Sequence, residues 1–197
     1  MKSATSFFNR GVFVKSVLRF WPIWANYAFV QLLVLPLNII APLSTPVSGH
    51  VNQQVIEAAA YVAQYLCPAA CCASALAVFA HLYSDRAADF YSVLPVSRRA
   101  MFTSLSLAGL LPLLAANVLI FLISLATEAV FGFSGLPALL EWLGAVSLLT
   151  AAYFGIAVFC AQLTGHIVVM PILFIAFGVV VSWLGNMALV VPDMFCY

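Results

Sequence analysis

Charged residues are scarce in this sequence. Its 197 residues include seven Lys or Arg and six Asp or Glu, so that 7% of the chain is charged and 65% is hydrophobic. In soluble domains about a quarter of the residues are charged, and a water-exposed globule could not be built from so few. The net charge of +1 says little about partners, and no nucleic-acid partner is expected.

Catalytic signatures are also missing. The sequence contains no Gly-x-x-x-x-Gly-Lys-[Ser/Thr] phosphate loop, no Gly-x-Ser-x-Gly turn and no His-Glu-x-x-His helix. A phosphate loop holds nucleotide phosphates through its backbone amides and its lysine, so this chain is not expected to hydrolyse ATP by that route. We expect no enzymatic activity and no cofactor in the chain itself.

The five cysteines do not form a clear metal-ligand pattern. Cys67 and Cys71 would share one face of a helix, which suits a soft-metal site built from thiolates. Alternatively, buried cysteines behave as small hydrophobic residues at helix contacts. No neighbouring carboxylate or His completes a ligand shell around this pair, so the second interpretation is favoured and no metal is expected.

Long apolar runs, by contrast, dominate the sequence. A helix needs roughly 20 apolar residues to cross a bilayer, and about five runs reach this length. They predict an all-α, polytopic membrane helical bundle whose transmembrane domain covers 21–197. The predicted spans are 21–41, 58–80, 102–126, 142–163 and 167–191. No charged residue lies near the centre of a predicted span, which argues against a transporter that powers itself by ion coupling.

Uncharged polar and small residues inside the spans indicate helix contacts. The polar set is Gln31, Asn38, Gln64, Asn117, Tyr153, Gln162 and Asn186. These side chains could line a substrate path or form interhelical hydrogen bonds, and the second role is favoured for any single one. Ala69, Ala73 and Ala77 recur every four residues and predict a closely packed helix face.

The few basic residues fall into two segments. They are Lys2, Arg10, Lys15 and Arg19 before the first span, and Arg86, Arg98 and Arg99 in the loop 81–101. The opposite loops carry Glu57, Glu128 and Glu141, with Asp193 near the C-terminus. Because Lys and Arg accumulate in cytoplasmic loops, this pattern predicts a multi-pass protein whose N-terminus and loop 81–101 face the cytoplasm.

The segment 6–20 precedes the first span and has an imperfect helical amphipathicity. Phe13, Val14 and Leu18 gather on one side at 100° per residue, while Lys15 and Arg19 lie opposite. This pattern predicts a helix lying in the headgroup layer, with Trp21 at the membrane boundary. The alternative is a frayed basic leader that only orients the first span.

The cytoplasmic loop 81–101 has the features of a docking element. Pro95 restricts Leu94 to an extended backbone, and Ser97 is expected to cap the following helix. A short amphipathic element at the membrane face could form a binding site for an ATPase subunit. The candidate docking residues are Arg86, Leu94, Pro95, Arg98 and Arg99.

Two stretches carry a family resemblance: Arg19-Phe20-Trp21-Pro22-Ile23-Trp24 and Ser92-Val93-Leu94-Pro95-Val96-Ser97-Arg98-Arg99. Both are similar to segments of bacterial ABC-2 type permeases, the membrane subunits of certain ATP-binding cassette transporters. Members tend to have an aromatic-rich Trp-Pro entry and a Ser-Leu-Pro-type loop followed by Arg. The resemblance implies an elbow helix within 1–20 and a coupling element at 84–99 that docks on a separate ATPase subunit.

The resemblance also implies a bacterial inner-membrane location, with a second permease subunit as a further partner. The family unit usually has six spans, so the sequence is interpreted as a permease subunit or its N-terminal part. The alternative is a small, non-transporting membrane scaffold or accessory protein. Instead of docking a partner, Arg86, Arg98 and Arg99 could also be simple topology signals beside anionic lipid.

Overall fold

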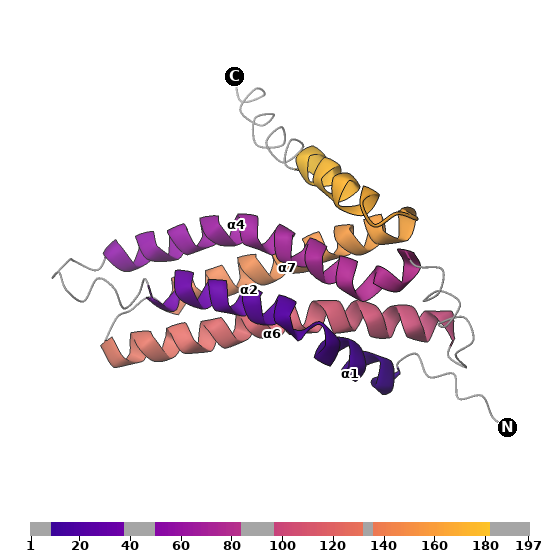
Figure 1. The fold of residues 1–197 in the computed structure, drawn as a ribbon. Helices are drawn as coiled ribbons and strands as arrows, with labels where there is room; N and C mark the ends of the chain where they lie inside the picture. Colours follow the sequence, from indigo (N-terminus) through magenta and orange to yellow (C-terminus); the bar gives the residue numbers. More distant parts are fainter. Residues whose placement is uncertain (1–8, 38–49, 84–96, 132–135, 182–197) are drawn as a thin grey trace, which may run out of the picture.

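A computed structural model describes residues 9–37, 50–83, 97–131 and 136–181 of the chain. Within these ranges the protein is all-α, as the sequence predicts, and contains no strand (Figure 1). The elements are α1 (Arg10–Arg19), α2 (Trp21–Val34), α4 (His50–Phe79), the 3₁₀ turn η2 (Ala80–Tyr83), α6 (Arg98–Phe131) and α7 (Leu136–Leu163). A further short apolar helix covers Val169–Val181.

Three helices are long and apolar enough to cross a membrane. The candidate spans are Val55–Tyr83, Arg98–Ala129 and Leu136–Leu163, with 29, 32 and 28 residues. Each exceeds the roughly 20 residues that a bilayer requires. The described residues therefore indicate a membrane protein.

The three long helices begin earlier than the sequence predicts. Helix α4 starts at His50 and α7 at Leu136, so parts of the predicted external segments 42–57 and 127–141 are helical. Packing explains the extension, because Ile56 is 6% exposed and Leu139 is fully buried. Tertiary contact of an apolar residue stabilises a helical turn that hydropathy alone assigns to a loop. Similarly, α6 exceeds the predicted 102–126 at both ends.

The first and last predicted spans are described only in part. Helix α2 is 14 residues long and ends at Val34, and the last helix is described from Val169 as far as Val181. Residues 38–41 and 182–191 of the two predicted spans lie outside the described residues.

Cross-helix hydrogen bonds fix how the helices run. Trp24 and Tyr27 of α2 pair with Ser74 and Cys67 of α4, so the two helices are antiparallel. Tyr27 also forms a hydrogen bond with Asn117 of α6. The Ser74 hydroxyl donates to the carbonyl of Gly109, which is also in α6. Helices α2 and α6 therefore run in one direction, and α4 runs in the other; α7 also runs opposite to α6 in Figure 1.

Small residues of α4 form the centre of the bundle, but not the ones expected. Ala59, Ala63 and Ala75 are fully buried, together with Cys67 and Cys71. Of the predicted face, Ala69 and Ala73 are exposed instead, and Ala77 is half-buried. Because alanines occur on several sides of α4, their spacing alone could not identify the packed side.

Candidate functional site

Helix α1 begins with a side-chain cap and ends where the chain changes direction at Phe20. Asn9 is its N-cap, and its Oδ1 accepts hydrogen bonds from the amides of Gly11 at 3.0 Å and Val12 at 3.3 Å. Phe20 separates α1 from α2 with a non-helical backbone, and the Arg19 guanidinium lies 5.4 Å from its ring centroid. The predicted N-terminal helix is therefore present over residues 10–19.

One side of α1 packs on the bundle rather than facing lipid. The Asn9 amide donates to Ser104 Oγ of α6 at 2.8 Å, and Ser16 is 8% exposed. Val12 and Val17 pack against the core from the same side. The contact ties the start of α1 to the first two turns of α6.

Part of the predicted apolar face of α1 is exposed on the surface of the bundle, and part is half-buried. Val14 is 41% exposed and Leu18 67%, one helical turn apart on α1, and Trp21, the first residue of α2, is 63% exposed. Lys15 and Arg19 are exposed beside them. An exposed apolar ridge flanked by cations is the arrangement that an interfacial membrane helix needs.

The start of α6 carries the second basic pair. Ser97 caps the helix as predicted, because its Oγ accepts from the amide of Ala100 at 3.2 Å. Arg98 and Arg99 follow in the first turn, and both are exposed. Ala100 is 2% exposed and anchors this turn in the bundle.

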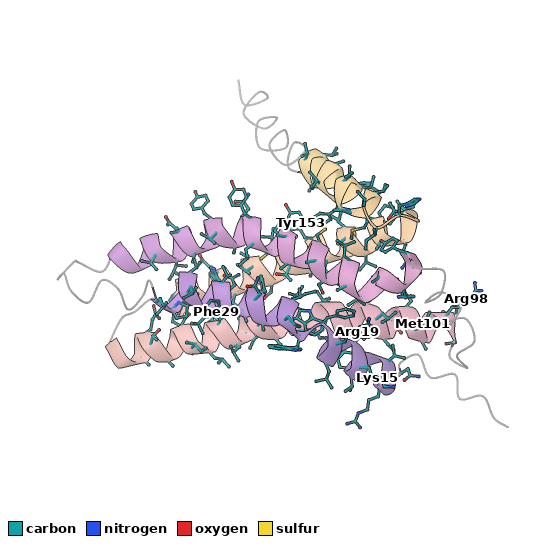
Figure 2. The ribbon with its side chains drawn as sticks, in the orientation of Figure 1. Lys15, Arg19, Phe29, Arg98, Met101 and Tyr153 are labelled. Atoms are coloured by element: carbon teal, nitrogen blue, oxygen red, sulfur yellow. The ribbon has the colours of Figure 1, made fainter. Side chains whose placement is uncertain are left out.

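The fold brings the two basic segments to one end of the bundle. Figure 2 shows Lys15, Arg19 and Arg98 at the end where α1 lies on α6. We call this surface the basic end and define it by Arg10, Lys15, Arg19, Arg98 and Arg99. The other predicted docking residues, Arg86, Leu94 and Pro95, lie outside the described residues.

The described acidic residues gather at the opposite end. Glu57 lies in the first turns of α4 and Glu141 in the first turns of α7, and both are exposed. Glu128 was expected in an external segment, but it lies in α6 and is 3% exposed. The charge separation seen along the sequence is thus also a separation in space, as positive-inside topology requires.

A buried polar cluster connects four helices in the middle of the bundle. The Tyr27 hydroxyl donates to Asn117 Oδ1 at 2.7 Å and lies 3.3 Å from Cys67 Sγ. Gln31 Nε2 donates to the Tyr27 hydroxyl at 3.3 Å. Asn117 Nδ2 donates to Thr150 Oγ1 at 3.2 Å. Every member is buried and has at least one polar partner, so the cluster acts as an interhelical clamp.

Comparison with protein-family models, curated proteins and solved structures gave no match.

The polar cluster was only partly predictable. Of the polar residues noted in the sequence, Gln31 and Asn117 take part, whereas Gln64 and Gln162 are exposed. Tyr27, Cys67 and Thr150 were not predicted as partners, because no spacing in the sequence relates residues on three different helices. Hydroxyl and thiol side chains scattered among apolar residues do not indicate their partners, because the partners are set only when the helices pack.

The described residues contain no group of three His, Cys, Asp or Glu side chains that could hold a metal ion. The polar cluster is buried, and most of its polar atoms have hydrogen-bond partners. The basic end, by contrast, is exposed. The basic end is therefore the better candidate for contact with another molecule, and acidic protein surfaces and anionic lipid fit its charge.

Proposed function

We propose that this chain is a membrane-spanning permease subunit of an ATP-binding cassette transporter, driven by a separate ATPase subunit. The basic end is the docking surface, with Arg98 and Arg99 at its centre and the segment 84–99 as the coupling element. Helix α1 serves as the elbow helix at the cytoplasmic membrane face. In a bacterial cell this places the protein in the inner membrane, with a second permease subunit completing the pathway.

The observation that carries this proposal is the contact between α1 and α6. The Asn9–Ser104 hydrogen bond of 2.8 Å joins the elbow to the helix that directly follows the proposed coupling element. A force applied before Arg98 would act on α6 and α1 together. This is a mechanical arrangement suited to transmitting movement of an ATPase into a bundle.

The topology in this proposal has five spans and a cytoplasmic N-terminus. Helix α2 forms the first span, the three long helices form the next three, and the helix that begins at Val169 forms the fifth. Turn residues 164–168 then lie on the cytoplasmic side with the basic end. The absence of Asp, Glu, Lys and Arg from the middle of the three long helices agrees with an energy source in another subunit.

The test is affinity purification of the full chain from its native membrane in mild detergent. We expect a stoichiometric P-loop ATPase to co-purify with the wild type and to be lost from Arg98→Glu/Arg99→Glu. The matched control is Arg98→Lys/Arg99→Lys, which keeps the positive charge for topology and lipid but removes the bidentate guanidinium fork.

Loss of the ATPase from the Glu pair, with a reduced yield from the Lys pair, supports protein docking through the arginines. If no ATPase is recovered at native expression, the proposal fails and a non-transporting membrane scaffold explains the chain better. If both pairs retain the ATPase, the basic end is not its docking surface.

A further inference from the structure

Four buried polar atoms toward the acidic end of the bundle have no hydrogen-bond partner within the described residues. They are Gln31 Oε1 of α2, Ser124 Oγ and Glu128 Oε1 of α6, and Trp142 Nε1 of α7. The exposed fraction of each of these side chains is 3% or less. We call the four residues the outer polar row. Buried polar groups are nearly always paired with protein or ordered water, so four unpaired groups in one region require an explanation.

Three members of the row continue the buried faces that meet at the polar cluster. Asn117 Nδ2 and Thr150 Oγ1 are 3.2 Å apart, which places these residues of α6 and α7 at one level. Both helices keep a buried face from this level toward the acidic end. At a rise of 1.5 Å per residue, Ser124 lies about 10 Å, Trp142 about 12 Å and Glu128 about 16 Å beyond it. The unpaired donor therefore lies at a depth between the two unpaired acceptors of α6.

Helices α2 and α4 border the same region. Gln31 lies one turn beyond Tyr27, to which its Nε2 donates at 3.3 Å, and so about 6 Å farther along the axis. On α4 the fully buried residues Ala63 and Ala59 lie about 6 and 12 Å beyond Cys67. An alanine side chain has no polar atom and takes up little space. Helix α4 therefore supplies no side-chain partner for the outer polar row.

Toward the basic end, by contrast, buried polar side chains are paired across the helices. Trp24 Nε1 donates to Ser74 Oγ at 3.4 Å, and Ser74 Oγ donates to the carbonyl of Gly109 at 3.1 Å. Among the described residues, Ser106 Oγ is the one buried side-chain atom without a partner on this side. The unpaired groups thus lead from the polar cluster in one direction, to Glu128 in the last turn of α6.

We propose that the outer polar row is a hydrated site that opens to the external side at Glu128 and admits small polar solutes. The Trp142 indole is a donor only, whereas the unpaired oxygens of Gln31 and Glu128 are acceptors. Because these atoms do not bond to one another, the molecule that joins them must both donate and accept, as water and hydroxyl groups do. As the outer half of a transport path the site rests on the proposed function, whereas its hydration does not.

The first test measures thiol accessibility in the full chain, in intact cells and in a background without the native cysteines. A small, charged methanethiosulfonate that cannot cross the membrane is applied from outside. Ser124→Cys should react at least about tenfold faster than Leu122→Cys, because only the thiolate reacts and a thiol in hydrocarbon does not ionise. Leu122 is the matched control, since it lies two residues away on α6 and is 56% exposed on the surface of the bundle.

Two further variants give the limits of the measurement. Leu136→Cys, exposed at the acidic end, should react at once, and Ser106→Cys, on the other side of the polar cluster, should not react. If Leu136→Cys reacts and Ser124→Cys does not, the site does not admit solutes and the proposal fails. It also fails if Ser124→Cys reacts no faster than Leu122→Cys.

The second test needs no substitution at the site, because it follows the indole N–H groups of the wild type in micelles by NMR. The Trp142 signal, assigned by its loss from Trp142→Phe, should exchange hydrogen with water several-fold faster than the Trp24 signal. The Trp24 N–H is held by Ser74, and a hydrogen-bonded group exchanges only when its bond opens. Equal exchange at the two indoles overturns the proposal. Neither test involves an ATPase, so a failure of the proposed function and a failure of this site give different results.

Discussion

Asn117 uses both ends of its amide to join helices at mid-membrane depth. It accepts from Tyr27 at 2.7 Å and donates to Thr150 at 3.2 Å, which links α2, α6 and α7. Interhelical hydrogen bonds of this kind are worth about 0.6 kcal/mol on average in a membrane protein and up to about 1.7 kcal/mol. The cluster therefore contributes little to the free energy of unfolding, and its main effect is to favour one packing arrangement of the helices.

Gly109 of α6 lies close to the side chains of Phe154 on α7 and Ser74 on α4. A Cβ atom at this position would lie 2.6 Å from Phe154 Cζ and 3.2 Å from Ser74 Oγ. Phe154 is 3% exposed, so its ring has little room to move away. A residue larger than glycine here must push the two helices apart.

We expect Gly109→Ala to lower the free energy of unfolding by about 1–3 kcal/mol, the usual cost of overpacking. Unfolding in mixed detergent micelles, followed by circular dichroism, measures the change. Gly144→Ala is the matched control, since a Cβ there meets nothing within 4 Å, and it should be neutral. Adding Phe154→Leu to Gly109→Ala should restore part of the loss; an unchanged stability in Gly109→Ala would contradict the close contact.

At the element scale, one hydrogen bond anchors the start of α1 to α6. Its ten residues are too few to form a stable helix alone in water. The Asn9 cap and the Ser104 hydrogen bond compensate at its first turn. Neither contact follows from amphipathicity, which is the signal that predicts the helix.

Ser104→Ala should loosen α1 without unfolding the bundle. Its amides, measured by hydrogen–deuterium exchange in micelles, should exchange several-fold faster, because a hydrogen bond of about 0.5–1.5 kcal/mol is lost. Ser106→Ala serves as the control, since the Ser106 hydroxyl is buried without a partner within the described residues. Equal exchange in the two variants would show that Ser104 does not hold α1.

For the whole molecule, the arrangement of charge is the most informative property. The five described Lys and Arg residues lie in α1 and in the first turn of α6, at one end of the bundle (Figure 1). The three described Glu residues lie near the other end, in the first turns of α4 and α7 and in the last turn of α6. The bundle between them presents exposed apolar side chains such as Phe29, Leu122 and Leu148. This distribution fits a protein surrounded by lipid and oriented by its basic end.

The orientation can be checked by single-cysteine labelling in a background without the native cysteines. Glu57→Cys and Leu136→Cys, both exposed at the acidic end, should react in intact cells with a maleimide that cannot cross the membrane. Gly165→Cys, in the exposed turn between α7 and the last helix, should react only after permeabilisation. Labelling of Gly165→Cys in intact cells would reverse the proposed topology.

Composition and charge spacing were enough to predict the class of this protein. Runs of apolar residues long enough for a bilayer have few alternatives to helices, because lipid offers no partner for a free amide or carbonyl. The basic segments likewise predicted which segments would share one face, and Ser97 predicted where α6 begins.

Tertiary structure decided the contacts between the helices. The buried face of α4 passes through Ala59 and Ala63 instead of Ala69, and α7 extends outward because Leu139 is buried. Helix packing also brought Tyr27 to Asn117 and Cys72 to Met170. A hydropathy pattern is a sum over neighbours in sequence, whereas these pairs depend on how each helix is rotated against the others, and close packing fixes that rotation.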